Sequence, residues 1–431
     1  MNDTLITPES YESEWLVRAS RRPIVGLARK IVRRMLSRLE TGQITICDAD
    51  YCDSFGQTTP EFPKGVTLTI NNPKAYTLMT FGGSIGSAEA YMLDYWDVDD
   101  LTALVRMVIR NQALFREMET GLARAAEPFY KAFGFLRRNT PAGSRKNIVA
   151  HYDLGNNFYR LFLDDTMTYS GGIFERPDAT LREASVAKYD RICRKLQLSE
   201  NDHVLEIGTG WGGFALHAVQ NYGCRVTTTT ISDEQHKAAR RRFARAGIED
   251  KVTLLKSDYR DLSGQYDKLV SIEMIEAVGH HYLGTFMSRC ADLVKPDGIV
   301  AIQAITMADW AFDQHKRSMD FIKRYIFPGS CIPSLTAISR AAADNTDLRL
   351  FHLEDITPHY AATLRMWRDN FLKNRPQVTA MGFSRRFMRM WEYYLRYCEA
   401  GFEERYLGNV QLVFTRPLTR MPAWNWPGDR R

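Results

Sequence analysis

A glycine-rich bend at the end of an apolar run is the part of this sequence best suited to hold a ligand. The stretch "VLEIGTGWGG", Val204 to Gly213, passes from aliphatic residues through an acid, Glu206, into four glycines within six residues. Glycine lacks a Cβ, so a backbone rich in glycine can approach a bound molecule closely. The chemistry predicted here is the binding of a cofactor at the turn between a strand and a helix.

Two classes of cofactor fit this bend. Gly208, Gly210 and Gly213 satisfy the GxGxxG pattern of dinucleotide sites, but such a site expects an acid about 20 residues further on to bind a ribose. The corresponding region, "VTTTTIS", has no acid, and the acid stands before the bend as Glu206. We therefore interpret the bend as a site for S-adenosylmethionine, whose aminoacyl group needs close backbone approach. A bend that only packs a strand against a helix is the alternative.

The segments that must position this bend alternate between β-branched runs and helical patterns. After "VLEIG" come a helix over residues 212–221, "RVTTTTI", a helix over 233–246, "KVTLLKS", "DKLVSIEMI", a helix around "YLGTFMSRCADLV", and "GIVAIQAI". Such alternation predicts an α/β domain with a mostly parallel sheet and helices on both faces. Ligands of such sheets bind at the carboxyl ends of the strands.

Composition excludes several classes of protein. The chain has 431 residues, 45% of them hydrophobic, and this allows two domains with sizeable cores. No stretch approaches the roughly 18 uninterrupted apolar residues of a membrane span, and "MNDTLITPES" lacks the features of a signal peptide, so we expect a cytoplasmic protein. The seven cysteines are irregularly spaced without a CxxC pair, which predicts reduced thiols and neither a disulfide framework nor a zinc site.

The net charge of +6 is unevenly distributed, because eight basic residues fall within "RASRRPIVGLARKIVRRMLSR" (residues 18–38). Aliphatic residues recur there at helical spacing. This cationic amphipathic helix can lie on an anionic membrane surface, or its apolar face can be the core of a domain, and both interpretations stay open.

The β-rich runs and the helical pattern that follow this helix predict a small α+β domain over residues 1–125. The basic segment "RRNTPAGSRKNI" predicts a linker within residues 126–150.

Six ordered blocks of residues resemble a known family. They are "HYDLGNNFYRLFLDDTMTYSGGIF", "VLEIGTGWGG", "TISDEQ", "MIEAVG", "FIKRYIFPG" and "MWEYYLRYCEAGF". Together they resemble the cyclopropane-fatty-acyl-phospholipid synthase family, which includes the mycolic-acid methyltransferases, and the first 125 residues resemble its N-terminal lipid-binding domain. The resemblance implies a Rossmann-like, seven-stranded methyltransferase domain over residues 151–431, with "LRLFHLEDI" and "VQLVFTR" as its last strands.

The same resemblance implies which residues contact S-adenosylmethionine. They lie in the "TYS" block, the glycine bend, the turn before the second helix and the end of the third strand. Ser232 and Gln235 also fit a capping box at the start of a helix, and both roles can coexist. With Glu206 from the argument above, the predicted cofactor-binding set is Tyr169, Ser170, Glu206, Gly208, Thr209, Gly210, Thr230, Ser232, Gln235, Asp258 and Tyr259.

The implied reaction transfers a methyl group from S-adenosylmethionine to the cis double bond of an unsaturated acyl chain in a membrane phospholipid. An alkene is a poor nucleophile, so alignment and exclusion of water should carry much of the catalysis. The resulting carbocation can be stabilised by aromatic faces, by about 1–2 kcal/mol each when desolvated. Aromatic residues between Tyr360 and Phe402 are candidates, although aromatic residues on helices more often belong to a core. Proton loss from the new methyl group would then close a cyclopropane ring.

In the family, the base that takes this proton is a bound bicarbonate. Its contacts map to Glu276, Tyr360 and the backbone of Ile305. Two positions depart from the family pattern: Gly171 stands where many members have Cys, and Gln303, which can hydrogen-bond but cannot titrate, stands where many have His. These departures leave the product open. Loss of a different proton would give a methylene branch, which a separate reductase could convert to a methyl branch.

The remaining expectations concern partners and competing sites. Glu273, in "SIEMIE", could add a carboxylate to this site, but we expect it to be a local structural partner. His280 and His281 should diverge on a helix, so no metal site is expected. The basic residues do not track a groove and no base-flipping motif is present, so no nucleic-acid partner is expected. We expect an enzyme at the inner face of the membrane rather than a vestigial lipid-binding fold, and a homodimer stays open.

Overall fold

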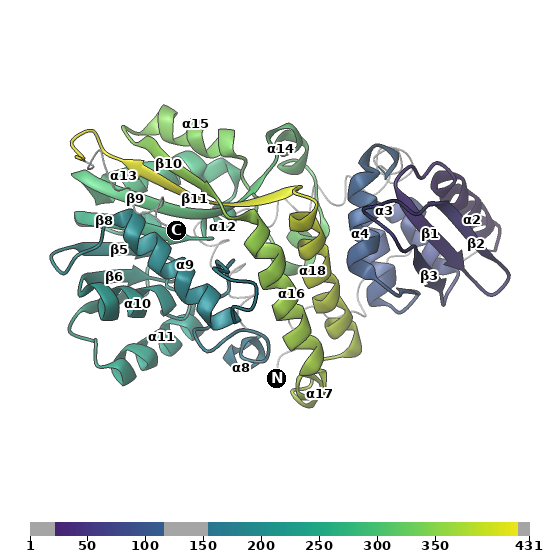
Figure 1. The fold of residues 1–431 in the computed structure, drawn as a ribbon, viewed down its shortest axis with the longest axis horizontal. Helices are drawn as coiled ribbons and strands as arrows, with labels where there is room; N and C mark the ends of the chain where they lie inside the picture. Colours follow the sequence, from purple (N-terminus) through teal and green to yellow (C-terminus); the bar gives the residue numbers. More distant parts are fainter. Residues whose placement is uncertain (1–21, 116–153, 421–431) are drawn as a thin grey trace. The chain divides into compact units, whose positions relative to one another are not determined.

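The computed structural model describes residues 22–115 and 154–420, and contacts between Cα atoms divide them into two compact units (Figure 1). Residues 22–115 form the first unit together with the later segments Met319–Ile326 and Arg375–Glu404. The remaining described residues form the second unit. The segment predicted as a linker, residues 126–150, lies outside the described residues.

The first unit is built on a four-stranded sheet with the order β2-β1-β3-β4. Strand β1 pairs antiparallel with β2 and parallel with β3, and β3 pairs antiparallel with β4. The strands are β1 (Gly42–Cys47), β2 (Cys52–Gln57), β3 (Val66–Ile70) and β4 (Trp96–Val98), and the helices are α2 (Arg22–Leu36), α3 (Lys74–Met92), α4 (Leu101–Arg110), η5 (Ile322–Ile326), α17 (Arg375–Ala380) and α18 (Arg385–Glu403). A small α+β region at the N-terminal end of the chain was predicted. The segments around η5 and α18 join it.

Helix α2 uses its apolar face as core. Ala28, Val32 and Leu36 are at most 4% exposed, and the helix packs against α3. On its basic face, Arg29 forms ion pairs with Asp48 and Asp50, and Arg33 pairs with Asp53. Lys30 and Arg34 remain exposed. Of the two interpretations left open for this helix, the structure favours the domain helix, because its apolar stripe is already buried in protein.

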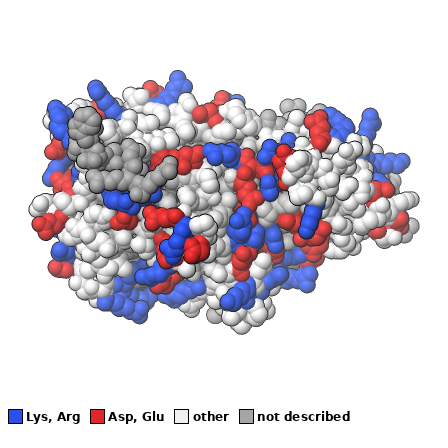
Figure 2. Space-filling view, in the orientation of Figure 1, with Lys and Arg blue, Asp and Glu red and all other residues white. Residues whose placement is uncertain are grey.

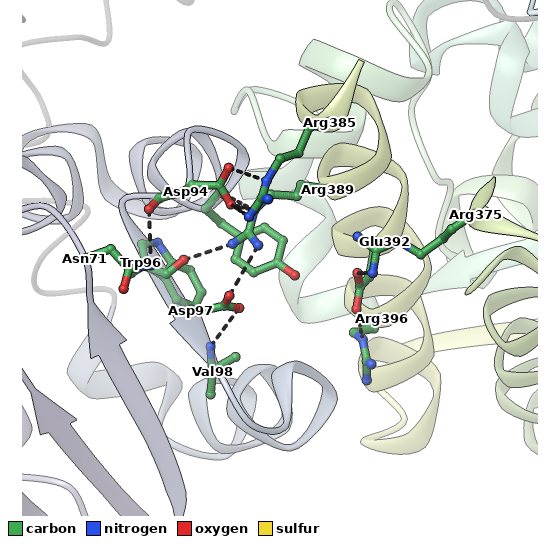
Figure 3. Close-up of polar contacts among 11 residues, drawn as sticks. Asn71, Asp94, Trp96, Asp97, Val98, Arg375, Arg385, Arg389, Glu392 and Arg396 are labelled. Carbon is green, nitrogen blue, oxygen red and sulfur yellow. Dashed lines mark hydrogen bonds and ion pairs between the residues drawn. The ribbon is translucent and has the colours of Figure 1, made fainter. Parts of the chain in front are cut away.

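One buried arginine fixes α18 to α3 and β4 (Figure 3). Arg389, 6% exposed, donates to the carbonyl oxygens of Tyr91 and Trp96 at 2.6 and 2.9 Å. Its guanidinium carbon also lies 3.8 Å from the centre of the Tyr91 ring. Asp94 accepts from Arg385 and lies 3.1 Å from Arg389. Buried guanidinium groups are stable only when they are paired in this way, so these contacts tie α18 into the first unit.

Cys47 and Cys52 form a disulfide where β1 and β2 meet, at positions that are register partners. The expectation that all cysteines are reduced is therefore wrong for this pair, because pairing of the two strands brings the two side chains together. The other cysteines, Cys193, Cys224, Cys290, Cys331 and Cys398, are thiols, as expected.

The second unit contains a seven-stranded sheet with the order β10-β11-β9-β8-β5-β6-β7 (Figure 1). Neighbouring strands from β9 to β7 are parallel, while β11 is antiparallel to both β9 and β10. The strands are β5 (His203–Ile207), β6 (Arg225–Thr229), β7 (Val252–Leu255), β8 (Tyr266–Ile272), β9 (Val294–Met307), β10 (Arg349–Asp355) and β11 (Leu407–Thr415). The predicted Rossmann-like, seven-stranded fold is confirmed, including its last two strands.

Helices cover both faces of this sheet. Successive residues of β5 alternate between two buried clusters, with Val204 in the cluster of α9, α10 and α11 and Leu205 in the cluster of α13 and α15. This is the pattern expected of a strand buried on both sides. The helices and turns are α8 (Asn156–Tyr159), α9 (Leu181–Leu196), α10 (Gly213–Tyr222), α11 (Asp233–Ala246), η3 (Tyr259–Asp261), α12 (Ile275–Val278), η4 (His280–Tyr282), α13 (Leu283–Leu293), α14 (Asp309–His315), α15 (Leu335–Asn345) and α16 (Thr357–Lys373).

Charged side chains of both signs are interspersed on the face drawn in Figure 2. Ion pairs join charges of opposite sign elsewhere in the described residues too, as in Arg385 with Asp94 and Arg176 with Glu183. Among the described residues, none of the helices has the length and apolar character needed to span a bilayer.

Candidate functional site

The glycine bend joins β5 to α10 at the carboxyl edge of the parallel strands. Gly208, Gly210 and Gly212 have φ values of 104°, 53° and 83°, conformations that cost glycine little because it has no Cβ. The N–H groups of Gly208 and Thr209 donate to the carbonyl oxygen of Thr229 at 3.1 and 3.0 Å, which fixes the bend to the end of β6. A Cβ at Gly210 would meet no heavy atom within 4 Å. The bend therefore offers open space beside exposed backbone, and this fits a ligand that approaches closely.

The turn that precedes α11 is held by three buried side chains. Ser232 caps the helix, since its Oγ accepts from the N–H of Gln235 at 3.3 Å. Thr230 donates from Oγ1 to Oε1 of Gln235 at 2.8 Å and accepts from the N–H of Ser232 at 3.1 Å. Only half of the predicted capping box forms, because the side chain of Gln235 bonds to Thr230 instead of to the backbone of Ser232.

Two buried ionisable groups lie beneath the bend and the "TYS" block. Glu206, at the end of β5, accepts from Oγ1 of Thr228 at 2.6 Å, and burial raises its pKa to about 8 despite that bond. Lys188, on α9, donates to Oγ of Ser170 at 2.6 Å, and burial lowers its pKa to about 8. The ammonium group orients the Ser170 hydroxyl. A direct contact between Glu206 and the cofactor stays a prediction.

The other predicted cofactor contacts are fixed by close neighbours. The ring centre of Tyr169 lies 5.2 Å from that of Trp367. The Asp258 carboxylate forms an ion pair with Arg260 at 2.7 Å. Burial alone would raise the pKa of Asp258, but its hydrogen bonds and charge contact with Arg260 lower it. Tyr259 packs edge-on against Phe286 at 5.5 Å.

One carboxylate gathers donors from four separate segments of the second unit. Glu273 directly follows β8, and its Oε1 accepts from the N–H of Gly171 (3.0 Å), Nε2 of Gln303 (2.8 Å) and Nδ2 of Asn409 (2.6 Å). Its Oε2 accepts from the hydroxyl of Tyr360 at 2.8 Å. The residue also has a φ of 48°, an uncommon conformation for a side chain of this size. These donors fix the carboxylate in one orientation.

Glu276, in α12, is the second carboxyl group of the site. Its Oε1 accepts from the N–H of Ile305 at 2.5 Å, while its buried Oε2 has no hydrogen-bond partner in the described part of the chain. Burial, together with the neighbouring charge of Glu273, raises its pKa to about 8. Glu276 is therefore mostly protonated at pH 7 and can donate a hydrogen bond.

A line of hydrogen bonds leads from Glu273 to a buried lysine. Gln303 accepts at Oε1 from Nε2 of Gln411 at 3.0 Å, and Gln411 accepts at Oε1 from Nζ of Lys195 at 2.7 Å. Gln303 and Gln411 are cross-strand partners on β9 and β11. Lys195, 1% exposed, also bonds to Glu354 at 2.5 Å.

Three of the residues expected for catalysis lie around a different carboxylate from the one that the family resemblance implied. Gly171, Gln303 and Tyr360 surround Glu273, which we expected to be only a local partner, and the N–H of Ile305 donates to the side chain of Glu276.

Sequence reasoning missed four polar residues of this site: Lys188 and Lys195 in α9, and the pair Asn409 and Gln411 in β11. The available signal was two amides inside the otherwise apolar run "LGNVQLVFT", where a buried polar residue needs a reason.

Two further expectations change with the structure. The rings of His280 and His281 do not diverge; their centres lie 3.8 Å apart, because the residues begin a single 3₁₀ turn instead of lying within an α-helix. Among the candidate aromatic residues, those of α18 pack in the first unit, where Tyr393 lies 4.8 Å from Phe321. Trp367 lies near Tyr360, at 6.1 Å between ring centres.

The residues present fit S-adenosylmethionine but not a separate bicarbonate. The open bend at Gly210, with Ser170 and the 230–235 turn, provides backbone and hydroxyl groups for the former. Of the donors expected to bind bicarbonate, Tyr360 already binds the carboxylate of Glu273 and the N–H of Ile305 binds Glu276, while Gln303 adds a further hydrogen bond to Glu273. A second anion there would face an unfavourable like charge.

Comparisons with known proteins show which family this chain is similar to. The family model described as mycolic acid cyclopropane synthetase matches residues 140–412. The chain is 35% identical over 412 residues to the tuberculostearic acid methyltransferase UfaA1 of Mycobacterium tuberculosis, covering 93% of this chain and 94% of that protein. It is 34% identical over 353 residues to the cyclopropane-fatty-acyl-phospholipid synthase of Escherichia coli K12, covering 81% and 87%. The crystal structure of mycolic acid cyclopropane synthase CmaA1 complexed with SAH and CTAB matches with a TM-score of 0.59 and 30% identity, over 63% of this chain and 98% of that one.

Proposed function

This chain belongs to the mycolic acid cyclopropane synthetase family of S-adenosylmethionine-dependent methyltransferases that act on lipid acyl chains, and on that premise we propose that it methylates the cis double bond of an unsaturated acyl chain in a membrane phospholipid. The cofactor is S-adenosylmethionine. The first product proposed is a cyclopropane fatty acyl chain.

The observation that carries this proposal is the pair of carboxyl groups that follows β8. Glu273 is an acceptor held by four donors, while burial raises the pKa of Glu276 to about 8. A carboxyl group held by four donors, beside a second one whose pKa is raised, supports a proton-transfer site at this place. Methyl transfer to an alkene needs such a site, because the reaction must end with the loss of one proton.

Bound S-adenosylmethionine supplies an electrophilic methyl group, and its addition to the double bond leaves a positive charge on the chain. Tyr169 and Trp367, whose ring centres lie 5.2 Å apart in the same unit, are the aromatic residues proposed to stabilise that charge. The donors around Glu273 hold a negative charge close to the same place, which stabilises a cation further.

A branched product is the second candidate, and two observations favour it. Gly171 and Gln303 depart from the pattern of the cyclopropane-forming family, and the UfaA1 match, to a protein named as a methyltransferase, extends over 93% of this chain. Loss of a proton from the new methyl group closes the ring. A 1,2-hydride shift before that loss leaves a methylene branch instead of a ring, and loss of a chain proton leaves a methyl-branched alkene; a separate reductase could saturate either product.

The test is gas chromatography–mass spectrometry of fatty acids from cells that express this chain alone. A cyclopropane product supports the first proposal, and a branched, unsaturated product supports the second. The same assay with purified protein, S-adenosylmethionine and vesicles of unsaturated phospholipid removes any contribution from host enzymes. The absence of every alkylated acyl chain in both assays would contradict the proposed function.

A further inference from the structure

We propose that the carboxylate of Glu273 is itself the base that takes the proton, in place of a bound bicarbonate, and that Lys195 holds it in position through Gln411 and Gln303. This inference rests on the proposed function. It assigns a catalytic role to Glu273. It assigns a positioning role to Lys195, which hydrogen-bonds to Gln411 and Glu354 and reaches Glu273 only through the two amides.

The environment of Glu273 is that of a bound anion. A backbone N–H, two amide groups and a phenol all direct hydrogens at its two oxygens, over distances of 2.6–3.0 Å. A small carboxylate-like anion would need these same donors. Because the side chain of Glu273 already uses them, the protein carries its own anion at this place and needs no external one.

Gly171 makes room for this arrangement. A Cβ built on Gly171 would lie 2.9 Å from Nδ2 of Asn409 and 3.1 Å from Cγ of Tyr360. Both of these residues hold Glu273. A side chain at position 171 would therefore displace two of its four donors, which gives a physical reason for glycine at a position where the family pattern has cysteine.

The side-chain amides of Gln411 and Gln303, which link Lys195 to Glu273, can have only one donor–acceptor orientation. An ammonium group can only donate, so Gln411 must present Oε1 to Lys195 and Nε2 to Gln303. Gln303 must then present Nε2 to Glu273, which as a carboxylate can only accept. The cation at one end and the anion at the other require the same orientation of both amides. An amide also keeps its donor at every pH, unlike an imidazole at position 303.

The two carboxylate oxygens of Glu273 have different roles. Among the described residues, Oε1 accepts three hydrogen bonds and Oε2 accepts only the one from Tyr360, so the lone pair proposed to take the proton is on Oε2. In the proposed step a C–H bond of the methylated cation breaks. Its electron pair forms the new carbon–carbon bond of the product, and the proton moves to Oε2. The proton then passes to solvent, which restores the carboxylate.

The first test compares Glu273→Gln with the wild-type enzyme. The amide has the same shape but cannot take a proton, so we expect turnover to fall by about 10²–10⁴-fold, the usual contribution of a general base. Binding of S-adenosylmethionine, measured by calorimetry, should stay the same. Wild-type turnover in carbon-dioxide-free buffer should not increase when bicarbonate is added. Wild-type dependence on bicarbonate, or full turnover of Glu273→Gln, would overturn the assignment.

The second test separates positioning from folding by comparing Lys195→Met with Lys195→Arg. Methionine fills the space without donating, so we expect kcat to fall at least tenfold with KM for both substrates unchanged. Arginine should restore most of the lost kcat, since it keeps a charged donor. Equal loss in both variants, or a change in KM alone, would refute the positioning role. A wild-type protein that alkylates no acyl chain would instead refute the proposed function.

Discussion

The hydroxyl of Tyr360 donates to Oε2 of Glu273 at 2.8 Å, whereas the family resemblance implied that it would donate to a bound bicarbonate. Tyr360 thus contacts the oxygen proposed to receive the proton. Its ring is buried, 6% exposed, and lies beside Trp367. The phenol therefore both orients the carboxylate and forms part of the wall around it.

Tyr360→Phe removes that hydrogen bond and keeps the ring. We expect turnover to fall about 10- to 100-fold, less than for Glu273→Gln, because the other three donors still hold the carboxylate. Stability should fall by about 1.5–3 kcal/mol, the cost of one hydrogen bond to a charged group. Initial rates of acyl-chain alkylation and urea unfolding measure the two effects. A variant as inactive as Glu273→Gln would mean that Tyr360 itself takes part in proton transfer.

Gly171→Ala tests the close packing that the structure shows around Glu273. The added methyl group would lie under 3.0 Å from Nδ2 of Asn409, so Asn409 or Tyr360 must move and kcat should fall at least tenfold. Gly82→Ala is the matched control, since a Cβ there meets nothing within 4 Å, and its activity should equal that of the wild type. Equal activity of both variants would show that the contacts of Glu273 tolerate displacement.

Glu276→Gln should change how stability depends on pH. The pKa of Glu276 rises from 4.5 to about 8 on folding, so between these values the native state binds more protons than the unfolded state and stability falls as pH rises. Glutamine does not titrate. The stability of the variant relative to the wild type should therefore increase steadily from pH 5 to pH 8.

Urea unfolding at several pH values across that window measures this difference. Glu206, whose pKa is also raised to about 8, is present in both proteins, so its contribution cancels in the comparison. A difference that does not vary with pH would show that Glu276 is ionised in the native state throughout.

Local patterns predicted the scaffold of the site well. The glycine bend and the strands on either side of it are encoded within about ten residues each, by backbone conformation and hydrophobic periodicity. The predicted helix over 233–246 is α11 to the residue. The last two strands followed from the family resemblance, and β10 and β11 occupy those segments.

The contacts at the centre of the site could not be predicted from local sequence patterns. Asn409 and Gln411 face their partners only because β11 runs antiparallel to β9 in one particular register, and no local pattern fixes that register. The position of Cys47 opposite Cys52 depends on strand pairing too. The aromatic pattern of α18 predicts a buried helix, but not that residues near 390 pack with residues near 90.

Arg389→Met tests the attachment of α18 within the first unit. The substitution leaves the carbonyl oxygens of Tyr91 and Trp96 without this donor and removes a charge partner of Asp94 (Figure 3). Loss of one member of a buried ionic network costs about 3–5 kcal/mol. Arg385→Met is the control: its side chain is 72% exposed, and a surface ion pair contributes about 0–1 kcal/mol. Similar unfolding free energies for the two variants would mean that α18 is held mainly by apolar packing.

The membrane role proposed for α2 now depends on its exposed residues alone. Arg29 and Arg33 are paired with acids, whereas Lys30 and Arg34 are exposed and Leu27 is 55% exposed beside them. Each basic residue near an anionic bilayer contributes about 1 kcal/mol. The double variant Lys30→Gln with Arg34→Gln should thus bind anionic vesicles about 30-fold more weakly at low salt, with little change in stability.

Cosedimentation with vesicles of phosphatidylglycerol and of phosphatidylcholine measures this difference, and the neutral vesicles should show none. Arg29→Gln with Arg33→Gln is the matched control. These residues already have carboxylate partners, so their loss should lower stability more than it lowers vesicle binding. Unchanged binding of the Lys30 and Arg34 variant would remove α2 from the membrane contact, because its apolar face is already core and cannot enter a bilayer while the first unit stays folded.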